Sequence, residues 1–225
     1  LLRRRILEGC DGSLHRLGTD RIDIYYQHHP DPEAPLAETL EALAELVQAG
    51  KVRHTACSNF SAAQMDEAFA LAAARADGGL PELVACQIHW SLLERAVEDD
   101  VVPAALRHGL GVIPYFPLAS GLLTGKYRGG DLPPGSRLAT LPRFRAPATE
   151  ENLVYVERLH QFAQERGHSL LELALGWLAA QPGVSSIIAG ATTAGQVATN
   201  VAAVAAWRLD TDDLAALPVR RRLGP

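Results

Sequence analysis

Apolar residues follow two patterns that alternate along this chain. Short runs rich in β-branched and aromatic residues predict strands at 22–27, 52–57, 83–88, 111–116 and 184–189. Apolar residues spaced three and four positions apart predict helices at 1–17, 36–49, 61–76, 97–108, 150–166, 169–181 and 193–206. Three of these helices begin with a predicted capping box, at Ser61–Gln64, Ser169–Glu172 and Thr193–Gln196.

The order of these elements predicts the fold class. Strand and helix alternate about five times, and this order requires parallel strands joined by helical crossovers, which defines an α/β fold. We expect a (β/α)8 TIM barrel that is incomplete, with about five of its eight units. An open doubly wound sheet is the alternative, but no Gly-x-Gly-x-x-Gly motif opens the first strand–helix turn. No repeat or composition shift marks a second domain, so residues 1–225 are expected to form one.

A long segment, 117–149, interrupts the alternation and is rich in glycine, proline and arginine. Loops of about thirty residues without regular structure are usually functional lids or binding segments. We therefore expect this one to be irregular and its second part, 128–149, to influence substrate choice. A short turn at 210–217 and a disordered basic tail are expected to end the chain.

Composition narrows the class of protein. A net charge of −5 argues against nucleic acid as the main partner, and the arginine runs at 3–5 and 220–222 are expected to be solvated. Three cysteines, an odd number, are best explained as reduced, buried thiols of a cytoplasmic protein. No apolar run is long enough to cross a bilayer, no signal peptide is apparent, and no metal-binding cluster or Schiff-base lysine is found at a strand end.

Polar residues gather where the predicted strands end, and these positions surround the active site in a barrel of parallel strands. They are His28, Ser58 with Asn59, Gln87 and Tyr115. Each residue also has a purely structural interpretation. His28 would be a hydrogen-bonded histidine at a strand end, Asn59 a cap at a helix entry, and Tyr115 part of the barrel wall.

An ordered set of motifs makes the functional interpretation stronger than any single residue does. The set is Arg16-Leu-Gly-Thr-Asp-Arg-Ile-Asp-Ile-Tyr25, Gln27-His-His-Pro-Asp31, Gly50-Lys-Val-Arg53, Ser58-Asn-Phe60, Gln87, Pro114-Tyr-Phe-Pro-Leu-Ala-Ser-Gly-Leu-Leu-Thr-Gly-Lys-Tyr127 and Ile187-Ile-Ala-Gly-Ala-Thr192 with Gln196 and Asn200. In this order the sequence resembles the aldo-keto reductase family, in particular bacterial members related to potassium-channel β subunits.

The resemblance implies a role for each matched residue. The family transfers a hydride from NADPH to a carbonyl with a tetrad of Asp, Tyr, Lys and His, and His28 matches the tetrad histidine. Ser58 and Asn59, with Gln87 beside them, would hold the nicotinamide carboxamide, and Tyr115 would stack under the nicotinamide ring. The remaining cofactor-binding residues would be Phe116, Leu118, Ser120 and Gly121 in the loop over the pyrophosphate, and Gly190, Thr192, Thr193, Gln196 and Asn200 near the 2′-phosphate.

Two departures from the family pattern qualify these expectations. The resemblance implies NADP(H) as the cofactor. Residues 190–196 contain no Lys or Arg to pair with the 2′-phosphate, however, so NAD(H) is an alternative. Thr193 and Gln196 would equally well form a capping box alone. The matches also begin just before the histidine strand, so the tetrad Asp, Tyr and Lys have no counterpart. Lys51 lies at the wrong end of a strand, Lys126 lies in the cofactor loop, and neither Tyr25 nor Tyr26 is a credible replacement acid.

The sequence therefore predicts an NAD(P)H-dependent oxidoreductase that reduces aldehydes or ketones, a small-molecule carbonyl reductase with no nucleic-acid or membrane partner. We expect the coding region to continue upstream by about eighty to a hundred residues, the length of three βα units. The 225-residue chain alone is expected to be inactive. The alternatives are a non-catalytic, nucleotide-binding regulatory subunit of the same fold and a fragment without a present function.

Overall fold

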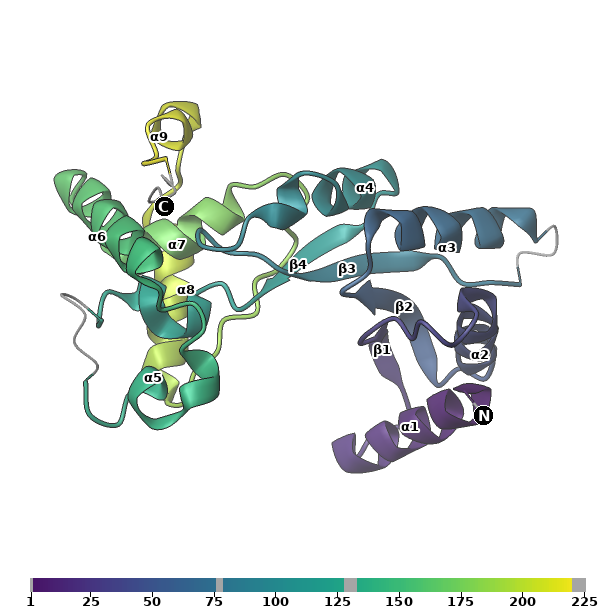
Figure 1. Cartoon of the computed structure of the whole chain (residues 1–225). Helices are drawn as coiled ribbons and strands as arrows, with labels where there is room; N and C mark the ends of the chain where they lie inside the picture. The colour runs from purple at the N-terminus through teal and green to yellow at the C-terminus, as the bar shows by residue number, and fades with distance from the viewer. Residues whose placement is uncertain (1, 76–78, 128–132, 220–225) are drawn as a thin grey trace. The chain divides into compact units, whose positions relative to one another are not determined.

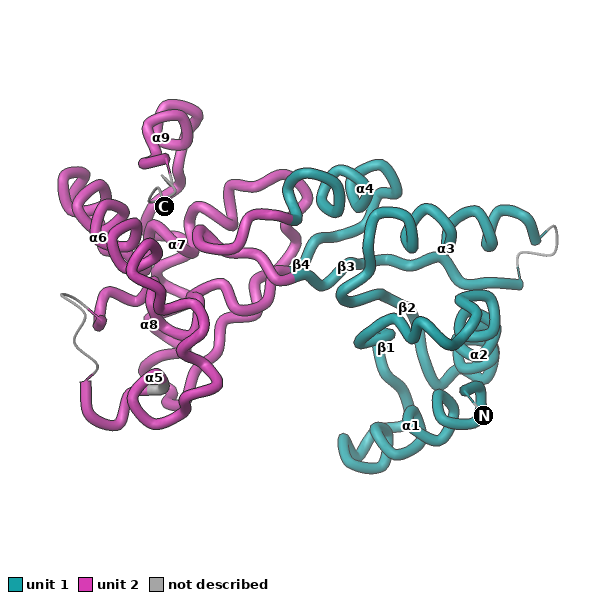
Figure 2. Tube along the Cα trace, in the orientation of Figure 1, with its two compact units in different colours: residues 1–88, 97–113 teal, residues 89–96, 114–225 magenta. Residues whose placement is uncertain are grey.

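The computed structural model describes residues 2–75, 79–127 and 133–219 of the chain. They form two compact units, shown in different colours in Figure 2. The first unit comprises residues 1–88 and 97–113, and the second comprises residues 89–96 and 114–225. Both units hold residues that the sequence predicts to be functional.

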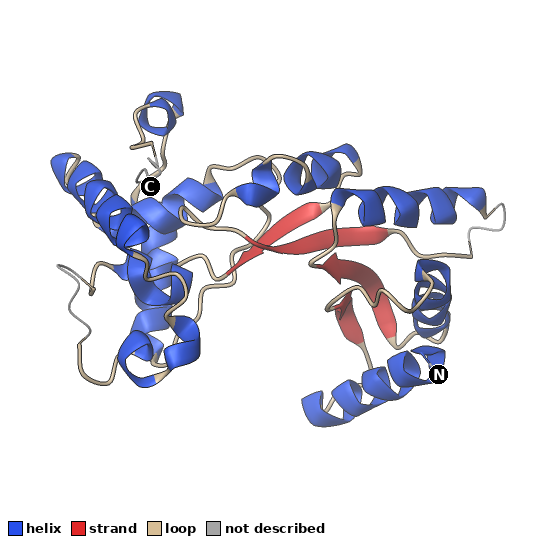
Figure 3. Cartoon of the chain, in the orientation of Figure 1, coloured by secondary structure: helices blue, strands red, loops and turns tan. Residues whose placement is uncertain are grey.

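The first unit alternates helix and strand, as the sequence predicts. Its strands form one sheet in the order β1-β2-β3-β4, and β1 pairs with β2, and β2 with β3, in parallel. The α/β class is thereby confirmed. Figures 1 and 3 show the elements, which are α1 (Leu2–Leu17), β1 (Ile22–Gln27), α2 (Leu36–Gln48), β2 (Val52–Ser58), α3 (Ala62–Ala74), β3 (Leu83–His89), α4 (Val101–Arg107) and β4 (Gly111–Tyr115).

The helices α1 and α2 cover part of this sheet, and single positions along β1 and β2 are exposed. Tyr25 and Thr55 are in register on β1 and β2; Tyr25 packs on the core below α1 and α2, and Thr55 is fully buried. Their neighbours Ile24 and His54, also in register, point to the opposite face and are exposed. β1 ends the sheet within the described residues. An open sheet with an exposed apolar residue on its first strand, Ile24, is what an incomplete barrel would leave.

All three cysteines are free and buried, which confirms their prediction as reduced thiols. Cys10 lies in the core between α1 and α2. Cys57 and Cys86 are in register on β2 and β3. A hydrogen bond with Cys86, together with burial, raises the pKa of the Cys57 thiol, so the thiolate form is disfavoured.

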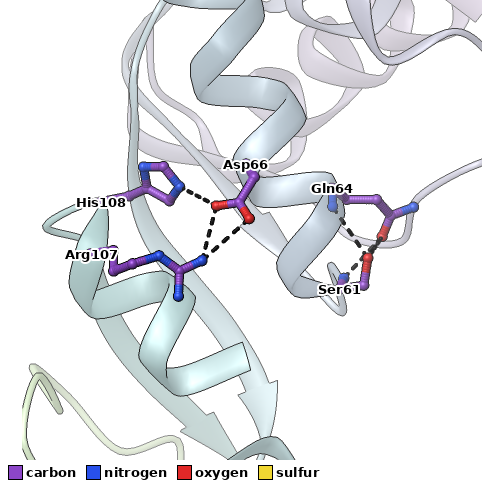
Figure 4. Close-up of polar contacts among 5 residues, drawn as sticks. All are labelled: Ser61, Gln64, Asp66, Arg107 and His108. Carbon is purple, nitrogen blue, oxygen red and sulfur yellow. Dashed lines mark hydrogen bonds and ion pairs between the residues drawn. The ribbon is translucent and has the colours of Figure 1, made fainter. Parts of the chain in front are cut away.

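Several local predictions are confirmed in the first unit. Ser61 and Gln64 form the expected capping box, with the Ser61 side chain accepting from the Gln64 backbone N–H (Figure 4). Predicted helix 97–108 is wrong in one respect, because it is divided into η1 (Ala96–Glu98) and α4. Pro103 lacks an amide hydrogen and fits only in the first turn of a helix, so a new helix must start just before it.

The second unit is mainly helical. It contains η2 (Ala119–Thr124), α5 (Arg137–Thr140), η4 (Pro142–Phe144), α6 (Glu150–Glu165), α7 (Leu170–Ala179), α8 (Ala194–Ala206) and α9 (Thr211–Ala215). Segment 117–149 is therefore not irregular throughout, because short helical turns fill much of it. Residues 128–132 and the predicted disordered basic tail at 220–225 lie outside the described residues.

Close packing around α7 holds this unit together. α7 contacts both α6 and α8, and the buried rings of Trp90 and Trp177 meet edge to face with centroids 5.8 Å apart. Gly176 allows the chain after α8 to approach, because a Cβ there would lie 2.5 Å from the backbone oxygen of Trp207. The capping box at Ser169 and Glu172, which starts α7, is present as predicted.

The fifth predicted strand, 184–189, does not form as a regular strand. It contains two bridge residues, Val184 and Ile188, and Ile188 pairs in parallel with Tyr115 through its N–H, which donates to the carbonyl oxygen of Pro114 at 2.9 Å. Pro114 has no N–H to donate in return, so the ladder cannot extend along β4. No helix among residues 2–75, 79–127 and 133–219 is long and apolar enough to cross a membrane.

Candidate functional site

The first unit brings three predicted cofactor residues together at the carboxyl ends of β2 and β3. Ser58 is the last residue of β2 and is buried, and its hydroxyl donates to Oε1 of Gln87 on β3 at 3.4 Å. Asn59 follows directly, and its backbone N–H donates to the carbonyl oxygen of Gln87 at 3.1 Å. Strand pairing in register, Ser58 opposite Gln87, is what creates this cluster.

The side chain of Asn59 connects this cluster to the end of β1. Its Nδ2 donates to the backbone oxygen of His28 at 3.0 Å and to the hydroxyl of Ser58 at 3.1 Å, and it lies 3.1 Å from Nδ1 of His29. His28 is the first residue after β1, where the sequence predicts it, and its exposed ring lies against that of His29 with centroids 4.4 Å apart. His29 is thus a site neighbour that the sequence did not single out.

The second unit places Tyr115 in an aromatic cluster. Tyr115 ends β4 and is half-buried, and burial raises the pKa of its phenol, so the ring is neutral near pH 7. Phe116 lies edge-on to it with centroids 5.5 Å apart. His89, the last residue of β3, is stacked on Tyr115 with centroids 5.3 Å apart and an angle of 13° between the planes. His89 was not predicted, although it follows Gln87 by two residues on a strand.

Backbone strain concentrates at the predicted site residues. Among the described residues, the non-glycine residues with positive φ are Asn59, Phe116, Ala119 and Ser120. Asn59, Phe116 and Ser120 are predicted cofactor residues, and Ala119 directly precedes Ser120. Such conformations are uncommon outside glycine and persist where surrounding contacts hold them, often at functional sites.

The predicted pyrophosphate loop, in the second unit, consists of short 3-10 turns joined by a kink at Ser120 and Gly121. Leu118 is buried and its carbonyl oxygen accepts from the N–H of Gly121 at 2.8 Å. Gly121 has φ +101°, and a Cβ there would lie 3.2 Å from Cε of Lys126. This position therefore requires glycine.

The predicted 2′-phosphate residues surround the start of α8. Thr193 caps the helix by accepting from the backbone N–H of Gln196 at 3.2 Å. The predicted capping box is incomplete, however, because Oε1 of Gln196 accepts from Thr192, from its N–H at 2.7 Å and from its hydroxyl at 3.1 Å. In a capping box Oε1 of Gln196 would instead accept from the backbone N–H of Thr193, the N-cap residue. Gly190 is exposed and Asn200 half-buried.

The lysines of the matched motifs and the two strand tyrosines have identifiable surroundings. Nζ of Lys51, just before β2, lies 2.5 Å from the carboxylate of Asp11. Lys126 lies over the ring of Tyr127, 5.0 Å from its centroid. Burial is the main cause that raises the pKa of both Tyr25 and Tyr26, which makes either a poorer acid.

Each unit, taken by itself, offers groups that parts of a nicotinamide cofactor can use. The first unit offers a hydroxyl and two side-chain amides, which can donate to and accept from a carboxamide. The second unit offers the planar Tyr115 ring, on which a flat heterocycle can stack. No group of three or more His, Cys, Asp or Glu residues suited to a metal ion occurs in the described part of the chain.

Comparisons with known proteins identify a family and several similar proteins. A family model described as the aldo/keto reductase family matches residues 2–218. A probable voltage-gated potassium channel subunit beta of rice is 38% identical over 209 residues, which are 91% of this chain and 62% of that protein. An aldo-keto reductase of Bacillus subtilis is 37% identical, covering 94% of this chain and 61% of the relative. An L-glyceraldehyde 3-phosphate reductase of Escherichia coli K12 is 36% identical, covering 95% of this chain and 62% of the relative.

Proposed function

Because this chain belongs to the aldo/keto reductase family, we propose that it serves in the NAD(P)H-dependent reduction of aldehydes or ketones to alcohols. The observation that carries the proposal is the cluster of one hydroxyl and two amides at the ends of β2 and β3, formed by Ser58, Asn59 and Gln87. Amide side chains that are fixed by strand pairing form a pre-organised counterpart for a carboxamide.

Each residue then has a separate task. The bound nicotinamide would supply the hydride. Asn59 and Ser58 would hold its carboxamide, with Gln87 beside them, and Tyr115 would support its ring. The imidazole of His28 would donate a hydrogen bond to the substrate carbonyl oxygen, which gains negative charge during reduction. Hydrogen-bond donors placed where charge develops lower the barrier of such a reaction.

The choice of cofactor follows from the start of α8. Residues 190–200 contain no Lys or Arg, and Thr192, Thr193 and Gln196 offer only hydroxyl, amide and backbone groups. A hydrogen bond to a charged group contributes about 1.5–3 kcal/mol, so its absence predicts a modest preference at most. We expect the dissociation constants for NADPH and NADH to differ by no more than about tenfold. Fluorescence titration with both cofactors measures this, and a hundredfold preference for NADPH would mean that a cation elsewhere holds the phosphate.

The catalytic step would need residues beyond those matched here. The chain spans about three-fifths of the length of the relatives it matches, 62% of the rice protein for example. The tetrad Asp, Tyr and Lys have no counterpart in its sequence. The test is therefore made on the full-length gene product, which should oxidise NADPH when 4-nitrobenzaldehyde is added. A full-length product that binds NADPH but reduces no aldehyde would contradict the reductase assignment.

A non-catalytic nucleotide-binding regulator is the second candidate. The relatives of rice and of Arabidopsis, both named as probable potassium-channel β subunits and both 38% identical, favour it. The two candidates share the cofactor site and differ in turnover. Saturable NADPH binding without aldehyde reduction by the full-length product would favour the regulator.

A further inference from the structure

His89 is the feature of the second unit that no role above uses. It ends β3, and alternation along a strand places its side chain on the same side as that of Gln87. Its ring is nearly parallel to that of Tyr115, 13° apart with centroids at 5.3 Å, and meets the ring of Phe116 edge-on at 5.6 Å. His89 therefore belongs to the aromatic cluster around the residue expected to support the nicotinamide.

The directions of the pKa shifts of His89 and Tyr115 favour a stack of two neutral rings. His89 is half-buried, and burial lowers the pKa of its imidazole, an effect that the nearby carboxylate of Glu94 opposes. The imidazole is then neutral near pH 7. Burial also raises the pKa of the Tyr115 phenol. Two neutral, flat rings in this arrangement form an attractive pair that restricts rotation of the tyrosine.

We propose that His89 is a positioning residue for the nicotinamide ring. It stacks on one face of Tyr115 and so fixes the plane of that ring, while the nicotinamide stacks on the opposite face. This inference rests on the proposed function and deepens it, since it names the residue that orients the cofactor's support. His89 itself touches Tyr115 and not the reacting atoms.

Loss of the His89 ring would make NADPH binding weaker, because binding would then have to order the Tyr115 side chain. Without its neighbour, the Tyr115 side chain can rotate, and the cofactor must then order it. Only ligands that carry a nicotinamide ring should bear this cost. Substitution of His89 is therefore expected to weaken NADPH binding about three- to tenfold and to leave a ligand without that ring unaffected.

The test compares two ligands by isothermal titration calorimetry. NADPH carries the nicotinamide ring, whereas 2′,5′-ADP keeps the adenosine and the 2′-phosphate and lacks it. We expect H89A to weaken NADPH binding about three- to tenfold without changing the affinity for 2′,5′-ADP. H89F, which keeps a flat ring at this position, should restore the affinity for NADPH.

A matched control is His168, whose ring is stacked on Trp207 with centroids 4.3 Å apart and planes 11° apart. H168A removes a similar stack within the same unit and should change neither affinity. If H89A does not fold, H89L fills the space without a planar ring and is compared with H89F instead.

The outcomes separate this inference from the proposed function. Unchanged NADPH affinity in H89A, an equal loss for both ligands, or H89F as weak as H89A would each overturn the role of His89 and leave the proposed function standing. Failure of the wild-type chain to bind either ligand would overturn both.

Discussion

The two units of this chain build their predicted cofactor residues in different ways. In the first unit, Ser58 and Gln87 lie opposite each other because two parallel strands pair in register. Asn59, which follows β2, has a left-handed backbone conformation, as do Phe116 and Ser120 of the second unit, where Tyr115 also depends on stacked aromatic rings. A regular sheet positions residues through its ladder, whereas an irregular segment needs specific contacts for each residue. Substitutions should therefore have different signatures in the two units.

The largest expected effect concerns proton donation to the substrate. We expect neither unit to supply a counterpart of the Tyr and Lys of the family's tetrad, and a general acid–base element typically contributes about 10²–10⁴-fold to rate. We expect the 225-residue chain to reduce 4-nitrobenzaldehyde at no more than the background rate in the presence of NADPH. The measurement is the loss of NADPH absorbance. Clear, enzyme-dependent turnover would show that one of the two regions holds a proton donor after all.

Next in size is a contrast within the first unit, measured on the full-length gene product. His28→Ala should lower kcat by about 10²-fold or more, because its imidazole would contact the reacting carbonyl. Asn59→Ala should instead weaken NADPH binding by about tenfold, the equivalent of one lost hydrogen bond. Steady-state kinetics together with NADPH titration separates the two. If both substitutions affected NADPH affinity equally, the assigned roles would be wrong.

The next prediction concerns the stability of the second unit, which depends on close packing at Gly176 of α7. Gly176→Ala would place a Cβ 2.5 Å from the backbone oxygen of Trp207, and overpacking of this kind costs about 1–3 kcal/mol of unfolding free energy. All three tryptophans, Trp90, Trp177 and Trp207, lie in the second unit, so their fluorescence reports on its unfolding in urea.

The matched control is Gly195→Ala in α8, where the nearest atom to the added Cβ is 3.9 Å away. This substitution should leave stability unchanged or raise it by up to about 1 kcal/mol, the helix preference of Ala over Gly. Equal fluorescence midpoints for the two variants would contradict the close packing between α7 and the chain after α8.

The smallest expected effect lies in the first unit, where Asp66 on α3 contacts the end of α4. Its carboxylate accepts from His108 at 2.7 Å and from Arg107 at 3.1 Å (Figure 4). The hydrogen bond with His108 is the main cause that lowers the pKa of Asp66. A lowered pKa in the folded state stabilises the protein above the unfolded value of about 3.9, and this gain is lost as the pH falls through the folded value.

Asp66→Asn should therefore lower the stability of the first unit slightly at pH 7, and the difference from wild type should shrink as the pH falls below about 4 and disappear below the lowered folded pKa. Circular dichroism during thermal unfolding at several pH values measures this. Glu67→Gln, the same change of charge one residue along α3, is the control and should have less effect at pH 7. A loss for Asp66→Asn that stayed constant with pH would rule out the ionic contribution.

The sequence predicted the regular elements well because their signals are local. The bounds of β1 and the capping boxes at Ser61 and Ser169 depend only on neighbouring residues. The sequence also predicted that Ser58 and Gln87 lie near the carboxyl ends of neighbouring strands. The structure has them opposite each other on β2 and β3, because parallel strands align these ends.

Tertiary contacts explain what the sequence missed. The segment around Ile188 has strand composition, yet it lies beside Pro114 of β4. Pro114 has no N–H and cannot continue the ladder. Gln196 has the right spacing for a capping box, but its side chain bonds to Thr192 instead. The stack of His89 on Tyr115 joins residues from different strands, and no periodicity indicates it.

The most direct test of the central claim, that this chain binds a nicotinamide cofactor through the predicted residues Asn59 and Tyr115, is the NADPH affinity of the chain and two variants. Tryptophan-excited NADPH fluorescence gives the dissociation constants of wild type, Asn59→Ala and Tyr115→Ala. We predict saturable binding by the wild-type chain, and weakening of about threefold to tenfold or more by each substitution. Wild-type binding that neither substitution weakens, or no binding at all, would contradict the claim.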